Sequence, residues 1–339
     1  MSLAGAGLAR GREPLTLGAY ASPKTFWERG GRLDEHGINA LFVHHRSIDE
    51  ALIRRARAEG ARVYAEFATF NGSEWLGRPE NAEAWPVEPG GGRSPKQTWF
   101  LGICPTNEAF LQSRLAELER LVTTKDVDGV WLDYLHWHAQ FEDPEPGLPE
   151  TCFNASCVER FGRETGVKAS TPAEILGRHE ETWRQWRCSV VADFARRCRA
   201  VIRKHKPRML LGNFHCAWRD DEHGGARRRI LGLDLPALAE VFDVFSPMVY
   251  HGRSGRPVDW VRRNVEWLGS AVRKVQIWPI VQAWSDPKGR AVSAEEFEQA
   301  LRGGLAGRSS GVMMFTLGAV AEDAGKLAVL KRVYRGLAG

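Results

Sequence analysis

Short apolar runs alternate with amphipathic segments along most of the chain. The apolar runs are nearly continuous, which is typical of parallel strands buried on both faces, whereas strict alternation would indicate half-exposed strands. A typical amphipathic segment is 107–123, in which Phe110, Leu111 and Leu115 share one helical face. The pattern predicts strands at 15–21, 38–45, 63–70, 129–132, 209–216, 241–251, 275–284 and 311–317.

Helical sequence follows each predicted strand. Two helix starts carry a capping box, Ser47 with Glu50 and Ser293 with Glu296. Eight strand–helix repeats predict an α/β fold, and within that class a (β/α)8 TIM barrel. An open doubly wound sheet would favour a G-x-G-x-x-G turn after the first strand, and none is present there. Helices are predicted at 23–36, 47–59, 107–123, 155–206 with breaks, 236–239, 258–273, from Ser293, and at 321–335.

Three stretches between predicted elements are too long to be simple connections. They lie at about 71–105, 136–154 and 217–226, and they are rich in Gly, Pro, Trp or acidic residues. No linker-like change of composition divides the chain. We therefore expect one barrel domain over residues 1–339, with these three loops at its active-site end.

A carboxylate follows the fourth predicted strand, in the run VDGVWLDYLHWH at 127–138. Asp133 comes directly after apolar residues and is followed by tyrosine, tryptophan and histidine rings. Burying such an acid is costly unless it is paired or functional. Barrel enzymes carry catalytic groups at the carboxyl ends of their strands, so Asp133 is the leading catalytic candidate. The structural alternative is a helix cap or a salt bridge at the barrel rim.

Cleavage of a glycosidic bond requires two carboxyl groups that flank the anomeric carbon. Asp133 is assigned the role of nucleophile or charge stabiliser. Glu66, inside an otherwise apolar strand, and Asp221, in an acidic loop, compete for the role of acid. The structural alternatives are a buried ion pair for Glu66 and a solvated loop for Asp221.

Polar and aromatic residues at the other strand ends and in the loops suit sugar binding. Amides form paired hydrogen bonds with hydroxyl groups, and aromatic rings supply large apolar faces for stacking. The predicted substrate-binding residues are Tyr20, His44, Trp75, His136, Trp137, Asn213, His215, Tyr250, Gln282 and Trp284.

Composition restricts the other classes of partner. The net charge is +5, but no basic cluster is interleaved with aromatic residues, so no nucleic-acid partner is expected. No apolar run reaches the roughly 18 residues of a membrane span. The start of the chain lacks the charged end and apolar core of a signal peptide. The expected location is secreted or periplasmic if a signal was removed, and otherwise cytoplasmic.

The six cysteines do not have the spacing of a disulfide scaffold. Cys188 and Cys198 lie on helical sequence and are expected to be packed thiols. For Cys152 and Cys157, a disulfide, a loop staple and a metal site with Cys104 or a histidine are all open. Loop structure is favoured because no second ligand pair lies at zinc spacing, so no metal and no cofactor are expected.

Two motifs resemble those of family-10-like glycoside hydrolase TIM barrels. The run 127–138, followed by 152–161, resembles their strand-four G-hydrophobic-x-L-D-Y motif, cysteine-containing loop and Arg/Phe helix. FDVFSPMVYH at 242–251 is similar to their strand-six motif, and 183–207 resembles the helix before strand five. The resemblance covers most of residues 60 to 285 and implies a glycosidase-like site with Asp133 as the matched acid. This chain departs from a common Cys-x-Cys-x-x-Cys spacing.

Three functions remain open on the sequence. The favoured one is a glycoside hydrolase that cleaves O-glycosidic bonds of an oligo- or polysaccharide. The second is a carbohydrate-binding barrel without catalysis. The third is a metal-dependent hydrolase, which lacks the H-x-H pair expected after the first strand. Its ligands would be His44, His136, His215 and Asp133. The sugar and the oligomeric state are not specified by these patterns.

Overall fold

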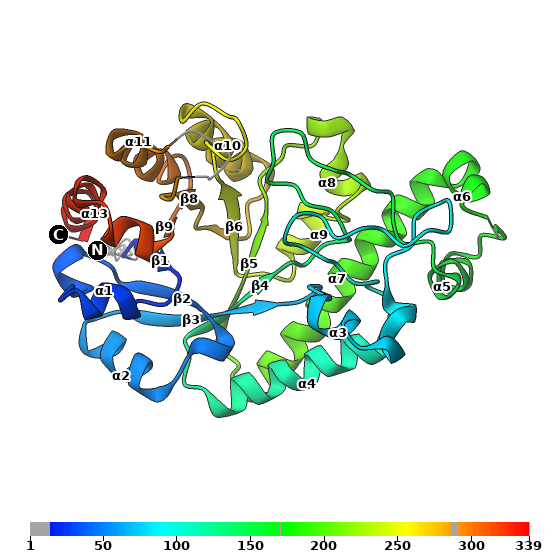
Figure 1. The fold of residues 1–339 in the computed structure, drawn as a ribbon, viewed down its shortest axis with the longest axis horizontal. Coiled ribbons are helices and arrows are strands. Elements are labelled where there is room, and N and C mark those ends of the chain that lie inside the picture. Colours follow the sequence, from blue (N-terminus) through cyan, green and yellow to red (C-terminus); the bar gives the residue numbers. More distant parts are fainter. Residues whose placement is uncertain (1–13, 170, 286–290, 339) are drawn as a thin grey trace, which may run out of the picture.

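A closed sheet of parallel strands forms the centre of the protein (Figure 1). The computed structural model describes residues 14–169, 171–285 and 291–338. β1 pairs with both β2 and β9, and β5 pairs with β6, so the sheet closes on itself and confirms the predicted (β/α)8 barrel. The strands are β1 Thr16–Tyr20, β2 Ala40–His44, β3 Arg62–Ala68, β4 Gly129–Asp133, β5 Leu210–Cys216, β6 Val244–Val249, β7 Gln276–Ile277, β8 Ile280–Gln282 and β9 Gly311–Phe315.

The seventh strand of the barrel is split into two pieces, β7 and β8, where the sequence predicts one strand at 275–284. Both pieces pair with β6, and Pro279 lies between them. Proline has no N–H to donate, so the regular ladder stops there. Trp278 N still donates to Phe245 O at 2.9 Å, and Pro279 O accepts from Met313 N at 2.9 Å. These two hydrogen bonds therefore hold the split strand between β6 and β9 in the barrel.

Helices surround the sheet on its outer side (Figure 1). α10, α11 and α13 pack against one another in sequence, and α4 packs along α7. The helices are α1 Lys24–Glu28, α2 Glu50–Ala58, α3 Ser73–Leu76, α4 Glu108–Thr124, α5 Ala155–Thr165, α6 Pro172–Arg178, α7 Glu180–His205, α8 Ala226–Arg229, α9 Leu235–Ala239, α10 Asp259–Ala271, α11 Ala294–Gly304, α12 Leu317–Ala321 and α13 Ala324–Ala338. None of them is long and apolar enough to cross a membrane.

The first predicted helix, 23–36, is shorter than the pattern suggests. α1 ends at Glu28, and Gly30 adopts a left-handed φ of 80° that turns the chain. The rest of the predicted segment forms only a 3-10 turn at Asp34–His36. Glycine adopts this backbone conformation at little cost, so the glycines end the helix despite favourable apolar spacing.

The two predicted capping boxes have different outcomes. The box at Ser293 is confirmed, because the Ser293 hydroxyl accepts from Glu296 N at 3.1 Å and the Glu296 carboxylate accepts in return. The box at Ser47 is wrong. α2 is capped by Asp49, whose carboxylate accepts from Leu52 N at 2.8 Å. Aspartate is an equally strong cap, and its position sets the first turn.

Side chains from the inward faces of the strands fill the barrel. Trp131 stacks on Trp278 with ring centroids 5.4 Å apart, and its Nε1–H donates to the Ser246 hydroxyl at 2.9 Å. Gly212 faces this indole, and a Cβ there would overlap it. Because side chains pack the interior, a ligand of the barrel binds at its mouth rather than inside it. The inner cluster comprises Ala40, Phe42, Tyr64, Trp131, Phe214, Val244, Tyr250, Trp278, Ile280 and Met313.

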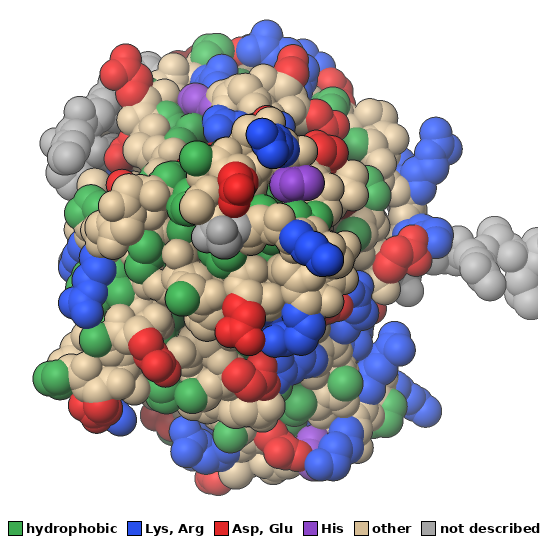
Figure 2. All heavy atoms as spheres, turned by 90° about the vertical axis from the view of Figure 1, so that its right-hand side faces the viewer, with side chains coloured by type: hydrophobic (Ala, Val, Ile, Leu, Met, Phe, Trp, Pro, Cys, Tyr) green, Lys and Arg blue, Asp and Glu red, His purple; other side chains and the backbone are tan. Residues whose placement is uncertain are grey.

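The long loops gather with α3, α5, α6 and α8 at one end of the molecule (Figure 1). Figure 2 shows that face, on which acidic and basic side chains are interspersed among apolar ones. The loop at 71–105 contains α3 and a 3-10 helix at Pro79–Ala84. This loop and the one at 136–154 both contribute to a cavity at the barrel mouth.

Candidate active site

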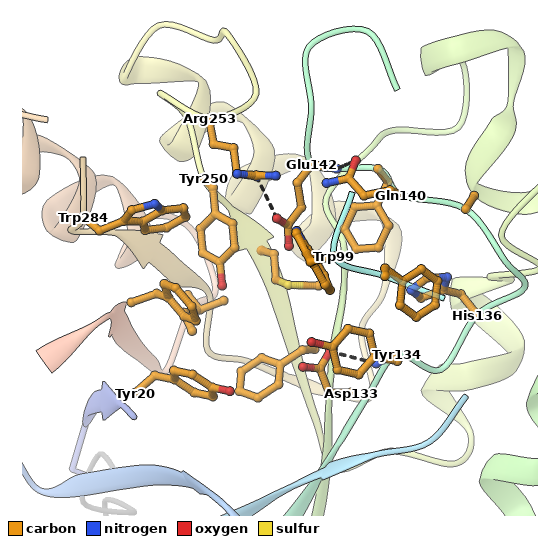
Figure 3. Close-up of a pocket in the computed structure, with 17 residues that line it drawn as sticks. Tyr20, Trp99, Asp133, Tyr134, His136, Gln140, Glu142, Tyr250, Arg253 and Trp284 are labelled. Atoms are coloured by element: carbon orange, nitrogen blue, oxygen red, sulfur yellow. Dashed lines mark hydrogen bonds and ion pairs between the residues drawn. The ribbon is translucent and has the colours of Figure 1, made fainter. Parts of the chain in front are cut away.

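A cavity of about 320 Å³ opens at the carboxyl ends of the strands. Its floor is made by residues of the strands, and its walls by residues from the following loops (Figure 3). This is the position at which barrel enzymes bind their substrates. The strand residues are Tyr20, Asp133, Phe214, Met248, Ile280 and Phe315, and the loop residues are Trp99, Phe100, Tyr134, His136, Ala139, Gln140, Phe141, Glu142, Tyr250, Arg253 and Trp284.

Asp133 lies on the floor of the cavity. It points inward because it is two residues beyond Trp131, which fills the barrel interior. Its Oδ1 accepts from Tyr134 N at 2.8 Å, and its backbone oxygen accepts from Thr69 N at 2.8 Å and from the Thr69 hydroxyl at 2.6 Å. The side chain is half-buried, so it is firmly held and still reaches the cavity.

Burial raises the pKa of Asp133 to about 7, and the nearby Glu142 charge adds to this shift. The hydrogen bond from Tyr134 N–H opposes it. A carboxyl group that titrates near neutral pH can hold a proton and release it during a reaction. Asp133 is therefore suited to act as a general acid, a role that the sequence interpretation gave to other residues.

Glu66 lies one layer deeper in the barrel than Asp133. In the sheet register Ala68 is level with Asp133, and Glu66 is level with Trp131 on one side and His44 on the other. Glu66 is only 2% exposed and does not line the cavity. Burial, and then the Asp133 charge, raises the pKa of Glu66 well above its usual range, with Arg114 opposing the shift. Glu66 is thus a buried neighbour beneath Asp133, and its raised pKa favours the protonated form.

Glu142 is a second acid in the cavity, and the sequence interpretation did not single it out. It comes from the loop after β4 and forms an ion pair with Arg253, with Oε2 2.8 Å from Nε. Figure 3 shows Glu142 and Arg253 above the cavity and Asp133 below it. The only sequence signal was the acidic character of the loop at 136–154, which does not indicate which acid turns inward.

Aromatic rings form the walls of the cavity. Tyr20 stacks on Phe315 with centroids 4.9 Å apart, and Tyr250 meets Trp284 edge-on at 4.9 Å. Burial raises the pKa of the Tyr20 and Tyr250 hydroxyls above the usual range, so both remain hydrogen-bond donors at neutral pH. Rings beside hydroxyl donors suit a ligand with both apolar faces and hydroxyl groups.

A turn after β4 carries two further residues into the cavity. Tyr134 adopts a left-handed φ of 55°, and its ring stacks on Phe100 at 5.4 Å. His136 follows, with Nδ1–H donating to Trp137 O at 2.8 Å, which leaves Nε2 as an acceptor. Burial lowers the pKa of His136 to about 4, so the ring is neutral near pH 7.

Five predicted site residues therefore meet at one cavity, and the others lie elsewhere. The residues brought together are Asp133, Tyr20, His136, Tyr250 and Trp284. Asp221 precedes a 3-10 turn at Glu222–Gly224 and lies outside the cavity lining. Acidic residues beside it are engaged in ion pairs, since Asp220 pairs with Arg227 and Glu222 with Arg256.

Strand alternation explains why Asn213 and His215 are not in the cavity. Phe214 between them belongs to the inner cluster and lines the cavity, so its two neighbours point outward. The His215 ring packs 5.2 Å from Phe245, which belongs to the layer between strands and helices. The sequence alone shows that these residues end a strand, but not which parity faces inward.

The remaining predicted binding residues have structural contacts instead. Trp75 packs edge-on against Phe110 at 5.5 Å, and Trp137 is fully buried beneath Arg187. His44 packs against His45 at 4.7 Å, level with Glu66 in the sheet. Gln282 is buried behind the wall, where it accepts from Arg253 N at 2.9 Å and donates to Trp284 O at 3.0 Å.

Three buried thiols lie together outside the cavity. Cys104, Cys152 and Cys157 have their sulfur atoms within 4.8 Å of one another, and the Cys104 and Cys157 sulfurs are 3.1 Å apart. This is the only group of three or more possible metal ligands in the described part of the chain. The histidines of the metal-dependent alternative therefore do not converge with Asp133 in the described residues.

Comparisons with known proteins give a structural likeness only. No family model matches the chain, and no curated protein matches its sequence. The PgaB (BpsB) glycoside hydrolase domain from Bordetella bronchiseptica matches with a TM-score of 0.69 and 14% identity, over 94% of this chain and 98% of that one. A β-galactosidase from Halorubrum lacusprofundi matches with a TM-score of 0.71 and 14% identity, over 96% of this chain and 58% of that one.

The GH42 β-galactosidase Gan42B of G. stearothermophilus matches with a TM-score of 0.68 and 12% identity, over 95% of this chain and 56% of that one. The chain thus spans just over half the length of these galactosidases. At such identities the likeness shows the barrel fold, which these glycoside hydrolases share. The narrower family-10-like resemblance is not supported by these matches and stays a prediction.

Proposed function

We propose that this protein is a glycoside hydrolase that cleaves O-glycosidic bonds of an oligo- or polysaccharide. The observation that carries the proposal is the half-buried Asp133 carboxyl, with a pKa of about 7, on the floor of an aromatic-walled cavity at the barrel mouth. Similar solved structures named as glycoside hydrolase, β-galactosidase and α-L-fucosidase add support at the level of the fold.

In the proposed reaction Asp133 donates its proton to the oxygen of the leaving sugar. The exposed part of the carboxyl faces the cavity, while burial keeps a proton on it near neutral pH. The ring of Trp284 and the hydroxyls of Tyr20 and Tyr250 then hold the sugar beside this acid. This assignment replaces the nucleophile or stabiliser role that the sequence suggested for Asp133.

The test is hydrolysis of a panel of substrates by the wild type and by Asp133→Asn. The panel comprises 4-nitrophenyl β-D-galactopyranoside, 4-nitrophenyl α-L-fucopyranoside and soluble polysaccharides followed by reducing-end release. We expect Asp133→Asn to lower turnover by about 100-fold or more, the usual contribution of a general acid. The amide keeps the acceptor for Tyr134 N–H, so the melting temperature should not fall. Full activity of the variant would reject Asp133 as the acid.

A carbohydrate-binding barrel without catalysis is the second candidate. It predicts saturable binding of oligosaccharides by calorimetry with no product from any member of the panel. The presence of Glu142 in the same cavity as Asp133 favours catalysis, because a glycosidase needs two carboxyl groups around the scissile bond.

A further inference from the structure

We propose that Glu142 is the second carboxylate of the reaction and acts at the face of the anomeric carbon opposite the leaving oxygen. The inference rests on the proposed function and deepens it. It differs from the sequence interpretation, in which Glu66 and Asp221 compete to complete the pair with Asp133.

The loop after β4 places Glu142 over the cavity. Gln140 Oε1 accepts from Glu142 N at 3.1 Å and from Asp143 N at 3.3 Å, and these hydrogen bonds within the loop stabilise its conformation. The Ser254 hydroxyl, from the loop after β6, donates to Glu142 O at 3.2 Å. Both Glu142 and Asp133 line the same cavity, from above and from the floor respectively (Figure 3). A sugar bound there lies between them.

Arg253 places a positive charge beside the Glu142 carboxylate. The two side chains are each 15% exposed, and Glu142 Oε2 lies 2.8 Å from Arg253 Nε. The arginine is itself anchored, because its backbone N–H donates to Gln282 Oε1 at 2.9 Å and its Nη2 lies 3.1 Å from Asp143 Oδ1. A positive charge this close to a carboxyl group favours the charged form of that group.

The two carboxyl groups therefore lie in different surroundings, Asp133 on the floor of the cavity and Glu142 paired with an arginine. Burial raises the pKa of Asp133, and the negative charge of Glu142 raises it further. Such separation of two carboxyl groups by their surroundings assigns one as acid and the other as the ionised partner. The other titratable groups that contribute to or line this region are Glu66, Tyr20, Tyr134, His136, Tyr250 and Arg253.

Glu66 is less suited to the role of partner. It is beneath Asp133, buried and outside the cavity lining, so it cannot reach an anomeric carbon above Asp133. Its buried carboxyl can influence Asp133 only as a neighbour. Asp221 lies outside the cavity altogether.

The step consumes one water. The Asp133 proton passes to the glycosidic oxygen as the bond from that oxygen to the anomeric carbon breaks. The Glu142 carboxylate removes a proton from water, and the water oxygen bonds to the anomeric carbon. Transfer of that proton back to Asp133 through solvent restores both carboxyl groups.

The experiment compares the wild type with Glu142→Gln, Glu142→Ala and the control Glu145→Gln. Glu145 is an acid of the same loop, but it is exposed and lies outside the cavity lining. On the 4-nitrophenyl glycoside that the wild type cleaves fastest, we expect Glu142→Gln to lose about 100-fold or more in kcat. Glu145→Gln should stay within a few fold. Melting temperatures check that each variant is folded.

Sodium azide tests the face at which Glu142 acts. Azide should restore turnover of Glu142→Ala and give a glycosyl azide of inverted anomeric configuration, because the small anion enters the space of the lost carboxylate. A folded Glu142→Gln with wild-type kcat, or the absence of azide rescue, would overturn this inference alone. If the wild type cleaves no member of the panel, the proposed function fails, and the inference fails with it.

Discussion

At the scale of single residues, Asp133 links the proposed catalysis to stability. Its pKa in the folded protein is about 7, above the ordinary value of an aspartate, so the folded state binds a proton more tightly than the unfolded state. The stabilising contribution of this proton is complete below the ordinary pKa and is lost as the pH rises through about 7. The raised pKa of Glu66 acts in the same direction.

We therefore predict that the free energy of unfolding of the wild type falls between about pH 5 and pH 8 by a few kcal/mol more than that of Asp133→Asn, because one pKa unit corresponds to about 1.4 kcal/mol. Urea denaturation at the two pH values measures this difference. The same free-energy change in both proteins would show that the Asp133 carboxyl is not desolvated.

At the scale of elements, the packing of β5 against β4 depends on a glycine. Gly212 lies beside the Trp131 indole, which has its own contacts with Trp278 and Ser246. A methyl group at position 212 overlaps the indole, so the ring or the strand must shift. Overpacking of this kind typically costs up to about 3 kcal/mol.

We predict that Gly212→Ala lowers the melting temperature clearly, whereas Gly177→Ala does not. Gly177 lies within α6, and a Cβ there has no neighbour within 4 Å, so alanine should leave stability unchanged or raise it by about 1 kcal/mol through helix propensity. Calorimetry of the two variants gives the comparison. Equal melting temperatures would mean that the barrel interior has room to adapt.

At the scale of the whole molecule, the buried thiols join segments that are distant in the sequence. Cys104 ends the 71–105 loop, which carries Trp99 and Phe100 into the cavity, and Cys157 lies in α5. The Cys157 sulfur is 3.1 Å from the Cys104 sulfur and 2.9 Å from the Thr106 hydroxyl. The contact between Cys104 and Cys157 therefore joins the 71–105 loop, which forms one wall of the cavity, to α5, which follows the 136–154 loop.

We predict that Cys157→Ala makes the 71–105 loop more sensitive to limited proteolysis and raises KM, with a loss of roughly 1–3 kcal/mol from the vacated volume. Cys188→Ala is the matched control, because this thiol is also buried but lies on α7. It should affect the melting temperature without changing cleavage of the loop. Identical proteolysis of the two variants would argue against a role of the Cys104–Cys157 contact in holding the 71–105 loop.

The pattern of apolar and polar residues along the chain was sufficient to predict the barrel fold. Continuous apolar runs such as 63–70, separated by amphipathic stretches such as 107–123, allow few arrangements other than parallel strands with helices outside. The place of Asp133 at the end of β4 followed from the same pattern. The errors in the predicted elements were local. Asp49 rather than Ser47 caps α2, and Pro279 splits the seventh strand. Local hydrogen bonding decides where a helix or strand ends, and periodicity leaves that open.

The sequence by itself determined the fold class and one acid at the barrel mouth, since both depend on periodicity and order along the chain. Only the tertiary structure decided which neighbours share the cavity with Asp133. Strand parity turns Phe214 inward and Asn213 outward, and loop packing brings Glu142 and Arg253 over the floor. These outcomes depend on contacts between segments far apart in the chain, which no local pattern records.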